Sequence, residues 1–319
     1  MEDIERARDR WLEEESLYKS FVNYLIERVA ALLRFDGLWV RVSGRAKELD
    51  SLLKKLLRRP DLVYNTVTDK AGVRIVVRFL EDLDAAVATL KRHVAVLKEE
   101  SVTARLGDDK FGYQGVHLDA TLLGNDPEFT KYGQCTVEIQ VRTLSQDAWS
   151  DMAHELSYKA DINVPKSLRR RVNCLSALME TADREFSAVN QEIMKLPDAG
   201  PMRIRSVLEK YYYKMTAEAY DKELSLDVIR LLWPLLHVEE RQAALHFQQF
   251  YDKNQAKVAL VFKTYSKLPN RSLFLSQPEI LLIFSLFDID PFSLRDTWNQ
   301  QFSDRELQKL GVAWGRPLD

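Results

Sequence analysis

Apolar residues recur with two different periods along the first 195 residues of the chain. Helical spacing, with apolar positions three and four residues apart, occurs in the segments 3–34, 47–59, 81–97, 146–159 and 166–195. Runs of β-branched and aromatic residues, which are typical of strands, occur at 38–42, 72–79, 116–123 and 135–143. This order of helices and strands predicts an α+β domain in which helices back a mixed sheet.

The segment LPDAGP at 196–201 collects two prolines and a glycine, which favours a break between domains. The residues after it are mostly helical in pattern and rich in Tyr, Phe and Trp, enough to form a second core. The sequence therefore predicts a first domain at 1–196 and a helical accessory or regulatory domain at 197–319. A plain stabilising or oligomerising extension is the alternative for the second domain.

Composition and charge narrow the possible functions. The 319 residues carry a net charge of -2 with a pI near 6.3, so no overall basic field indicates nucleic-acid binding. Cys135 and Cys174 lie outside any CxxC or Cys/His pattern, which argues against a disulfide framework and a structural zinc site. The charged start MEDIERARDRW does not fit a signal peptide, and the longest apolar run, ILLIFSLF at 280–287, is too short to span a bilayer. We expect a cytoplasmic protein without a membrane partner.

The segment VEIQVRT at 137–143 places polar and charged side chains on one face of a predicted strand. Because side chains alternate along a strand, Glu138, Gln140 and Arg142 share a face and the apolar residues share the other. A second acid, Asp69 in TDKAGVRI (68–75), comes directly before another predicted strand. Mg²⁺ in proteins is commonly held by one or two carboxylates together with substrate phosphates. Asp69 and Glu138 are therefore candidates to share a magnesium ion.

Basic residues gather where the first predicted strand leads into a helix, in VSGRAKELDSLLKKL (42–56). Arg45 and Lys47 lie at the turn, and Ser51 and Lys55 are four residues apart on one face of the helix. Cations that converge near a helix N-terminus suit a polyphosphate. The alternative is a solvated basic helix face.

Two further segments carry residues with either a packing or a binding role. In DDKFGYQGVH (108–117), Lys110 and Tyr113 lie beside glycines, and the tyrosine is either a packed turn aromatic or a ring that stacks on a base. In LSQDAWSDMAHELSYK (144–159), His154 lies on a predicted helix. A single helix histidine is more often hydrogen-bonded within the fold than catalytic.

Taken in order, GRAK with Ser51 and Lys55, DKAGVRI, GYQGVH, VEIQVRT and DAWSDMAHELSYK resemble the synthetase domain of RelA/SpoT-type alarmone synthetases, especially the small single-function members. The resemblance covers about residues 20–195. It implies a nucleotidyltransferase-like sheet. It also implies transfer of the β,γ-pyrophosphate of ATP to the 3′-hydroxyl of GDP or GTP, which gives the alarmones (p)ppGpp.

The resemblance also implies roles on the ATP side. Arg45 and Arg74 would hold the adenine between their guanidinium planes. The ATP phosphates would be held by Lys47, Ser51 and Lys55. Asp69 would ligate Mg²⁺, the expected cofactor.

On the acceptor side, the resemblance implies that Glu138 approaches the 3′-hydroxyl as base, metal ligand or both. Tyr113 would stack on the acceptor base, with Lys110, Gln140 and His154 nearby. Arg142 fits the motif and is expected to have a supporting role only.

Two departures from the family pattern fall on the acceptor side. The acceptor loop is one residue shorter than in guanosine-specific members and lacks their Pro and Asn, and the usual Leu-Glu-His becomes Met152-Ala153-His154. ATP use is therefore the firmer expectation, and the acceptor stays open between GDP or GTP, an adenosine nucleotide and the 3′ end of tRNA. The last two would suit a toxin of a toxin–antitoxin or phage-defence system. An inactive nucleotide-binding regulator is the remaining alternative.

The hydrolase half of the long family members has no counterpart, because no His-Asp dipeptide occurs in the sequence. We therefore expect a protein that makes its product without degrading it. Such an enzyme needs restraint, so a regulatory protein partner or a homo-oligomer formed through the C-terminal domain is a further expectation.

Overall fold

The computed structural model describes residues 4–101, 115–158, 165–216 and 218–318. The contacts within the chain divide it into two compact units. The first unit comprises Met1–Leu33 and Leu38–Val189, and the second comprises Arg34–Gly37 and Asn190–Asp319. The sequence predicts a domain boundary at residue 196, whereas the change between the compact units falls after Val189, inside a long helix.

The first unit combines strands and helices, and the second is helical in its described part. The strands are β1 (Arg41–Ala46), β2 (Ala71–Val77), β3 (Val94–Ser101), β4 (Val116–Leu122) and β5 (Val137–Thr143). The helices that begin in the first unit are α1 (Ile4–Phe35), α2 (Leu49–Arg58), α3 (Leu80–His93), α5 (Phe129–Tyr132), α6 (Leu144–Tyr158) and α7 (Lys166–Lys195). Those of the second unit are α8 (Gly200–Met215), α9 (Lys222–Leu232), α10 (Ala243–Tyr265), α11 (Ile280–Ile289), α12 (Pro291–Trp298) and α13 (Asp304–Trp314).

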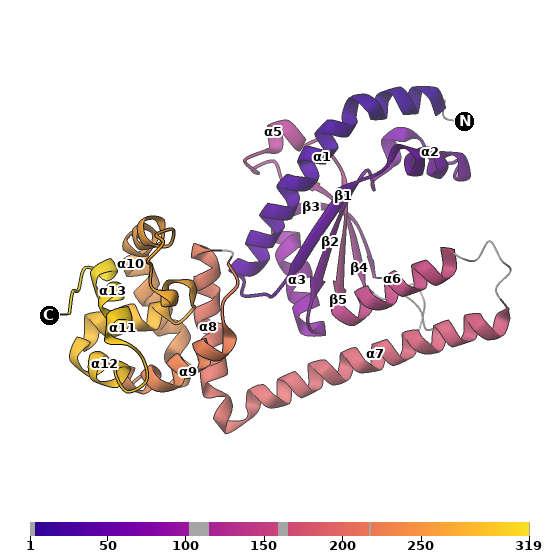
Figure 1. Ribbon diagram of the computed structural model, residues 1–319. Coiled ribbons are helices and arrows are strands. Elements are labelled where there is room, and N and C mark those ends of the chain that lie inside the picture. The colour runs from indigo at the N-terminus through magenta and orange to yellow at the C-terminus, as the bar shows by residue number, and fades with distance from the viewer. Residues whose placement is uncertain (1–3, 102–114, 159–164, 217, 319) are drawn as a thin grey trace. The chain divides into compact units, whose positions relative to one another are not determined.

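The strands form one five-stranded sheet in the order β1-β2-β5-β4-β3. β2 and β5 are parallel, and the other neighbouring pairs are antiparallel. The predicted mixed sheet, followed by a helical C-terminal region, is therefore confirmed (Figure 1).

One face of the sheet forms the core of the first unit. Its apolar residues, such as Val73, Ile139 and Leu118 on β2, β5 and β4, are buried together with Trp11 and Phe21 of α1. Figure 1 shows α1 and α3 on this side of the sheet and α6 on the other. Because side chains alternate along each strand, the opposite face is left to polar residues.

Two predicted boundaries are wrong. The helix expected at 81–97 ends at His93, and the residues from Val94 form β3, which pairs with β4. The last helical turn is Lys91-Arg92-His93, where positive charge favours a helix end, and valines alternate directly after it. The strand expected at 38–42 begins at Arg41, because its pairing with β2 runs from Arg41 to Ala46.

The second unit has its own apolar core around α11. All eight residues of the run Ile280–Phe287 are buried, and the ring of Phe284 stacks on Trp314 of α13 with centroids 4.3 Å apart. A helix that is apolar all round needs neighbours on every side, and α9, α10, α12 and α13 provide them. Among the described helices, none has the length and apolar character needed to cross a membrane.

Candidate active site

The polar face of the sheet gathers residues from four strands into adjacent rows. In one row the register places Arg45 of β1, Gly72 of β2, Glu138 of β5 and Asp119 of β4 side by side. Gly72 keeps the middle of this row open, because a Cβ there would meet only the carbonyl oxygen of Arg45, at 3.8 Å. The row therefore offers a shallow floor with a cation on one side and two acids on the other.

The next row along the same face contains Ser43, Arg74, Gln140 and His117, again from β1, β2, β5 and β4. The strand alternation that predicts a shared face for Glu138 and Gln140 thus extends over the neighbouring strands. Arg74 and Gln140, which are distant in sequence, become neighbours here because β5 inserts between β2 and β4.

Asp69 lies at the entrance to β2, and two lysines hold its carboxylate. Oδ2 of Asp69 lies 2.7 Å from Nζ of Lys47 and 2.9 Å from Nζ of Lys55. Burial would raise the pKa of Asp69, but the hydrogen bonds from the two lysines outweigh it and hold the pKa below its ordinary value. Its second oxygen, Oδ1, is buried and has no hydrogen-bond partner among the described residues.

Glu138 is the centre of a chain of hydrogen bonds on β4 and β5. Nδ1 of His117 lies 3.3 Å from Oε1 of Glu138, and Nε2 of Gln140 donates to Oε2 at 2.5 Å. The bond from His117 is the largest influence and lowers the pKa of Glu138; burial opposes it, and the bond from Gln140 lowers the pKa further. Glu138 is thereby kept as a carboxylate.

The chain of hydrogen bonds continues to α6 through Arg142. This side chain is only 5% exposed; its NH2 donates to Oε1 of Gln140 at 2.5 Å and its NH1 to Oγ of Ser150 at 3.1 Å. An arginine donates only and a carboxylate accepts only, so Gln140 between them has its oxygen toward Arg142 and its nitrogen toward Glu138.

Asp119 belongs to the site, although the sequence does not single it out. It stands directly opposite Glu138 in the register. Burial raises the pKa of Asp119, a hydrogen bond with Thr68 opposes this, and the charges of Glu138 and Asp69 raise it further. The alternation of VHLDATL places Asp119 on the polar face, but only the β4–β5 register shows that it faces Glu138.

The remaining residues of the predicted ATP side lie around the same face. Arg45 is exposed on β1, and Ser51 is exposed on α2 one turn before Lys55. Arg74 is half-buried, and its NH1 lies 3.3 Å from Oδ1 of Asp147 and 3.4 Å from Oδ1 of Asp151, both on α6. Arg45 and Arg74 thus lie on adjacent strands, with Arg74 already held by two acids.

For three residues of the predicted acceptor side, the structure does not describe the side chain. Lys110 and Tyr113 lie outside the described residues. His154 lies in α6, but its side chain is likewise outside what is described. Gln140 contacts Glu138 and Arg142 as described above.

The carboxylates fit a magnesium ion shared with a substrate. Asp69 and Glu138 lie close enough for the charge of Asp69 to act on the pKa of Glu138, and Oδ1 of Asp69 is unpartnered in the described part of the chain. Across the residues the structure describes, no three His, Cys, Asp or Glu side chains form a ready metal cage. A site that awaits substrate phosphates as further ligands needs only one or two carboxylates from the protein.

Comparison with known proteins shows which proteins share this region of the chain. Residues 44–163 match the region found in RelA/SpoT proteins. The chain is 25% identical over 211 residues to the GTP pyrophosphokinase YwaC of Bacillus subtilis, which covers 60% of this chain and 96% of that protein. It is 29% identical over 160 residues to the GTP pyrophosphokinase YjbM of the same organism, over 48% of this chain and 73% of that one.

The fold agrees with these matches. The crystal structure of small alarmone synthetase 1 from Bacillus subtilis superposes with a TM-score of 0.51 at 24% identity, over 59% of this chain and all of that one. The same protein bound to its product pppGpp also gives a TM-score of 0.51. The sheet and its helices therefore have the nucleotidyltransferase-like fold of small alarmone synthetases.

More particularly, the chain contains a RelA/SpoT region, as its motifs predict. YwaC and YjbM are both named as GTP pyrophosphokinases, so the comparisons support a pyrophosphoryl-transferring enzyme.

Proposed function

We propose that this protein is an ATP-dependent pyrophosphokinase that transfers the β,γ-pyrophosphate of ATP to the 3′-hydroxyl of GDP or GTP, giving (p)ppGpp. The observation that carries the proposal is the presence of two differently held carboxylates near each other, one at the entrance to β2 and one on β5. Asp69 is held by two lysines, and Glu138 is held by a histidine and an amide.

The lysine side of the site suits the donor. Lys47 and Lys55 converge on Asp69 from a turn and from α2, so the same ammonium groups are placed to bind phosphate oxygens. Arg45 and Arg74 on adjacent strands offer guanidinium planes for the adenine. Asp69 and Glu138 would hold Mg²⁺, which would neutralise charge on the phosphates when bound.

The glutamate side suits the acceptor. Pyrophosphoryl transfer needs a hydroxyl placed in line with the phosphorus and a group that takes its proton. Glu138 is kept as a carboxylate by His117 and Gln140 and is therefore ready to accept that proton. Lys110, Tyr113 and His154 complete the proposed acceptor site by resemblance.

The direct test measures which acceptor gains label. The protein is incubated with Mg²⁺, γ-labelled ATP and, in separate reactions, GDP, GTP, ADP or deacylated tRNA. Label on the guanine nucleotides supports the proposal. Label on ADP or tRNA would assign the toxic-synthetase alternative, and no transfer with ATP bound would assign the inactive regulator.

The variant Glu138→Gln tests the role of the carboxylate. Gln has nearly the same shape but cannot take a proton, so we expect kcat to fall at least about 100-fold, with ATP binding retained. Glu13→Gln, at an exposed position on α1, is the matched control and should leave turnover unchanged. Undiminished turnover in Glu138→Gln would refute the proposed mechanism.

A further inference from the structure

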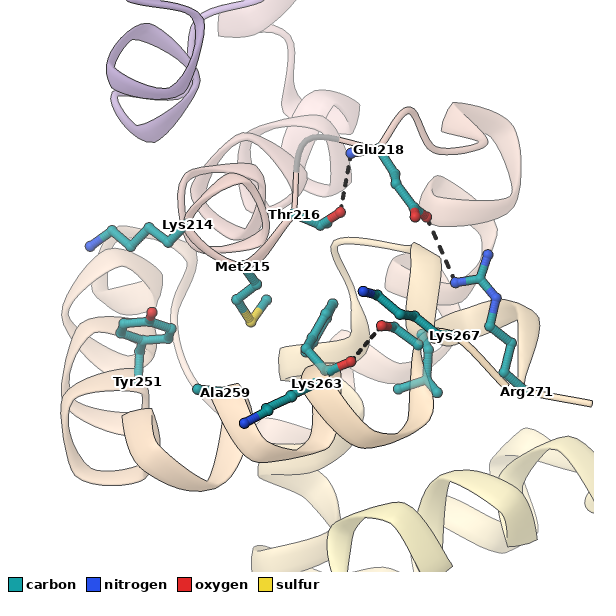
Figure 2. A pocket seen from close by; sticks show the side chains of 12 residues that line it. Lys214, Met215, Thr216, Glu218, Tyr251, Ala259, Lys263, Lys267 and Arg271 are labelled. Carbon is teal, nitrogen blue, oxygen red and sulfur yellow. Dashed lines mark hydrogen bonds and ion pairs between the residues drawn. The ribbon is translucent and has the colours of Figure 1, made fainter. Parts of the chain in front are cut away.

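The second unit contains a pocket of about 400 Å³ between α8, α10 and the turn that follows α10 (Figure 2). Small-molecule sites in proteins usually measure about 300–1,000 Å³. The pocket lies wholly in the second unit, so it is no part of the polar sheet face of the first.

The pocket carries an excess of positive charge. Four cations line it against one acid, Glu218: Lys214, Lys263, Lys267 and Arg271. Glu218 is already balanced, because its Oε2 lies 3.7 Å from NH1 of Arg271 and accepts a hydrogen bond from Ser276. Figure 2 shows Lys267 and Arg271 toward the side of Glu218, and Lys214 and Lys263 toward the side of Tyr251. Cationic side chains therefore come from both sides of the pocket.

The floor of the pocket is apolar and partly aromatic. Phe262, Leu275 and Tyr251 line it and are themselves buried, and Met215, the last residue of α8, lines it as well. Lys214 lies 5.2 Å from the ring centre of Tyr251, so charge and ring are adjacent. A free phosphate would use the cations only, whereas a ligand with a flat or apolar body would use the floor as well.

We propose that this pocket binds a phosphate-bearing small molecule with an aromatic body, the chemical class of the nucleotides. The phosphate would lie against Lys267 and Lys263, which form charge-assisted contacts with its oxygens. The ring would lie on the apolar floor. This binding is independent of whether the first unit transfers pyrophosphate.

Hydrogen–deuterium exchange on the full chain tests the proposal, because it separates this pocket from a nucleotide site in the first unit. GDP, ADP, inorganic pyrophosphate and guanosine are added separately, and protection is followed in peptides within 243–275. We expect protection with the nucleotides, weaker protection with pyrophosphate and none with guanosine. No protection with any probe would overturn the proposal, and so would equal protection by guanosine and GDP.

Variants at exposed positions keep the test clear of folding defects. The double variant Lys263→Gln/Lys267→Gln should weaken nucleotide binding in these peptides about tenfold or more, because charge-assisted contacts are lost. Lys253→Gln is the matched control, since Lys253 is exposed on the same helix but does not line the pocket. Unchanged protection in the double variant would refute the site, and Lys267→Glu provides a second, stronger test of the same charge.

Discussion

The charge state of Glu138 depends mainly on one imidazole. The hydrogen bond from His117 is the largest influence that lowers the pKa of Glu138. A base with a lowered pKa stays ionised as the pH falls, so activity is kept down to lower pH. His117→Ala should raise the pKa of Glu138 and move the acid limb of kcat/KM to higher pH. His93→Ala, at the end of α3, is the control, and an unmoved acid limb in His117→Ala would contradict this account.

In the proposed mechanism, Arg142 acts on Glu138 through Gln140, as a positioning residue. Without it, the Gln140 amide loses the contact that turns its nitrogen toward Glu138. Arg142→Met should lower kcat about tenfold, with little change in KM for ATP, because the loss equals about one hydrogen bond. The acid limb of the pH profile should also move to higher pH, a change that a purely structural role would not produce.

Folding must be checked for this variant, because Arg142 is buried beside Asp147. Arg142→Lys keeps the charge and one donor, so it should recover part of kcat. A variant that loses ATP affinity while kcat stays normal would place Arg142 in substrate binding instead.

The sequence predicts part of this site, and the rest depends on how neighbouring strands pair. Strand alternation alone predicts that Glu138, Gln140 and Arg142 share a face. The roles of His117 and Asp119 beside Glu138 depend on the register between β4 and β5, which alternation within one strand does not contain.

At the scale of elements, β1 lies close against its neighbours at Gly44. A Cβ at this position would lie 2.7 Å from the carbonyl oxygen of Gly72 and 2.9 Å from Cγ1 of Val22 on α1. Backbone cannot move aside as a flexible side chain can, so Gly44→Ala should lower the free energy of unfolding of the first unit by about 1–3 kcal/mol. Denaturant unfolding measures this.

Gly124→Ala is the matched control for Gly44→Ala, because nothing lies within 4 Å of its added Cβ. Equal stability of the two variants would show that β1 shifts without cost. Any loss of activity in Gly44→Ala should follow the loss of folded protein, since the added methyl group points toward the core.

Element type is predicted better than element boundaries, and β3 shows why. A single periodic segment, 81–97, joins the end of α3 to the start of a strand without a glycine or proline between them. Pairing with β4 is what draws the residues from Val94 into the sheet. This long-range contact determines where the helix ends, and the spacing of apolar residues within 81–97 does not predict it.

At the scale of the whole molecule, the apolar run ILLIFSLF illustrates how tertiary packing determines the role of a segment. Its length predicts that it does not span a bilayer, and the structure buries it as α11 at the centre of the second unit. The residue before it, Glu279, is buried as well and has no exposed surface. A buried carboxyl without a strong partner favours the protonated form.

Burial raises the pKa of Glu279 to about 7 from an ordinary value of 4.5, with Asp221 raising it further and Arg205 opposing. Between these two values the folded unit holds a proton that the unfolded chain has released. The contribution of Glu279 to the free energy of unfolding of the second unit should therefore be fully present below about pH 4.5. It should fall as the pH rises to about 7, and the unit should stay less stable above that pH. The loss amounts to about 3 kcal/mol.

Glu279→Gln removes this proton equilibrium, so the second unit should become more stable at pH 8 and change little at pH 5. Urea unfolding of the full chain at the two pH values measures the effect, with Trp298 and Trp314 as reporters of the second unit. Glu223→Gln, exposed in the first turn of α9, is the control for loss of one negative charge. If Glu279→Gln and the unaltered protein lose the same stability between pH 5 and pH 8, some other group titrates with folding, and the buried carboxyl of Glu279 is neutral or paired throughout.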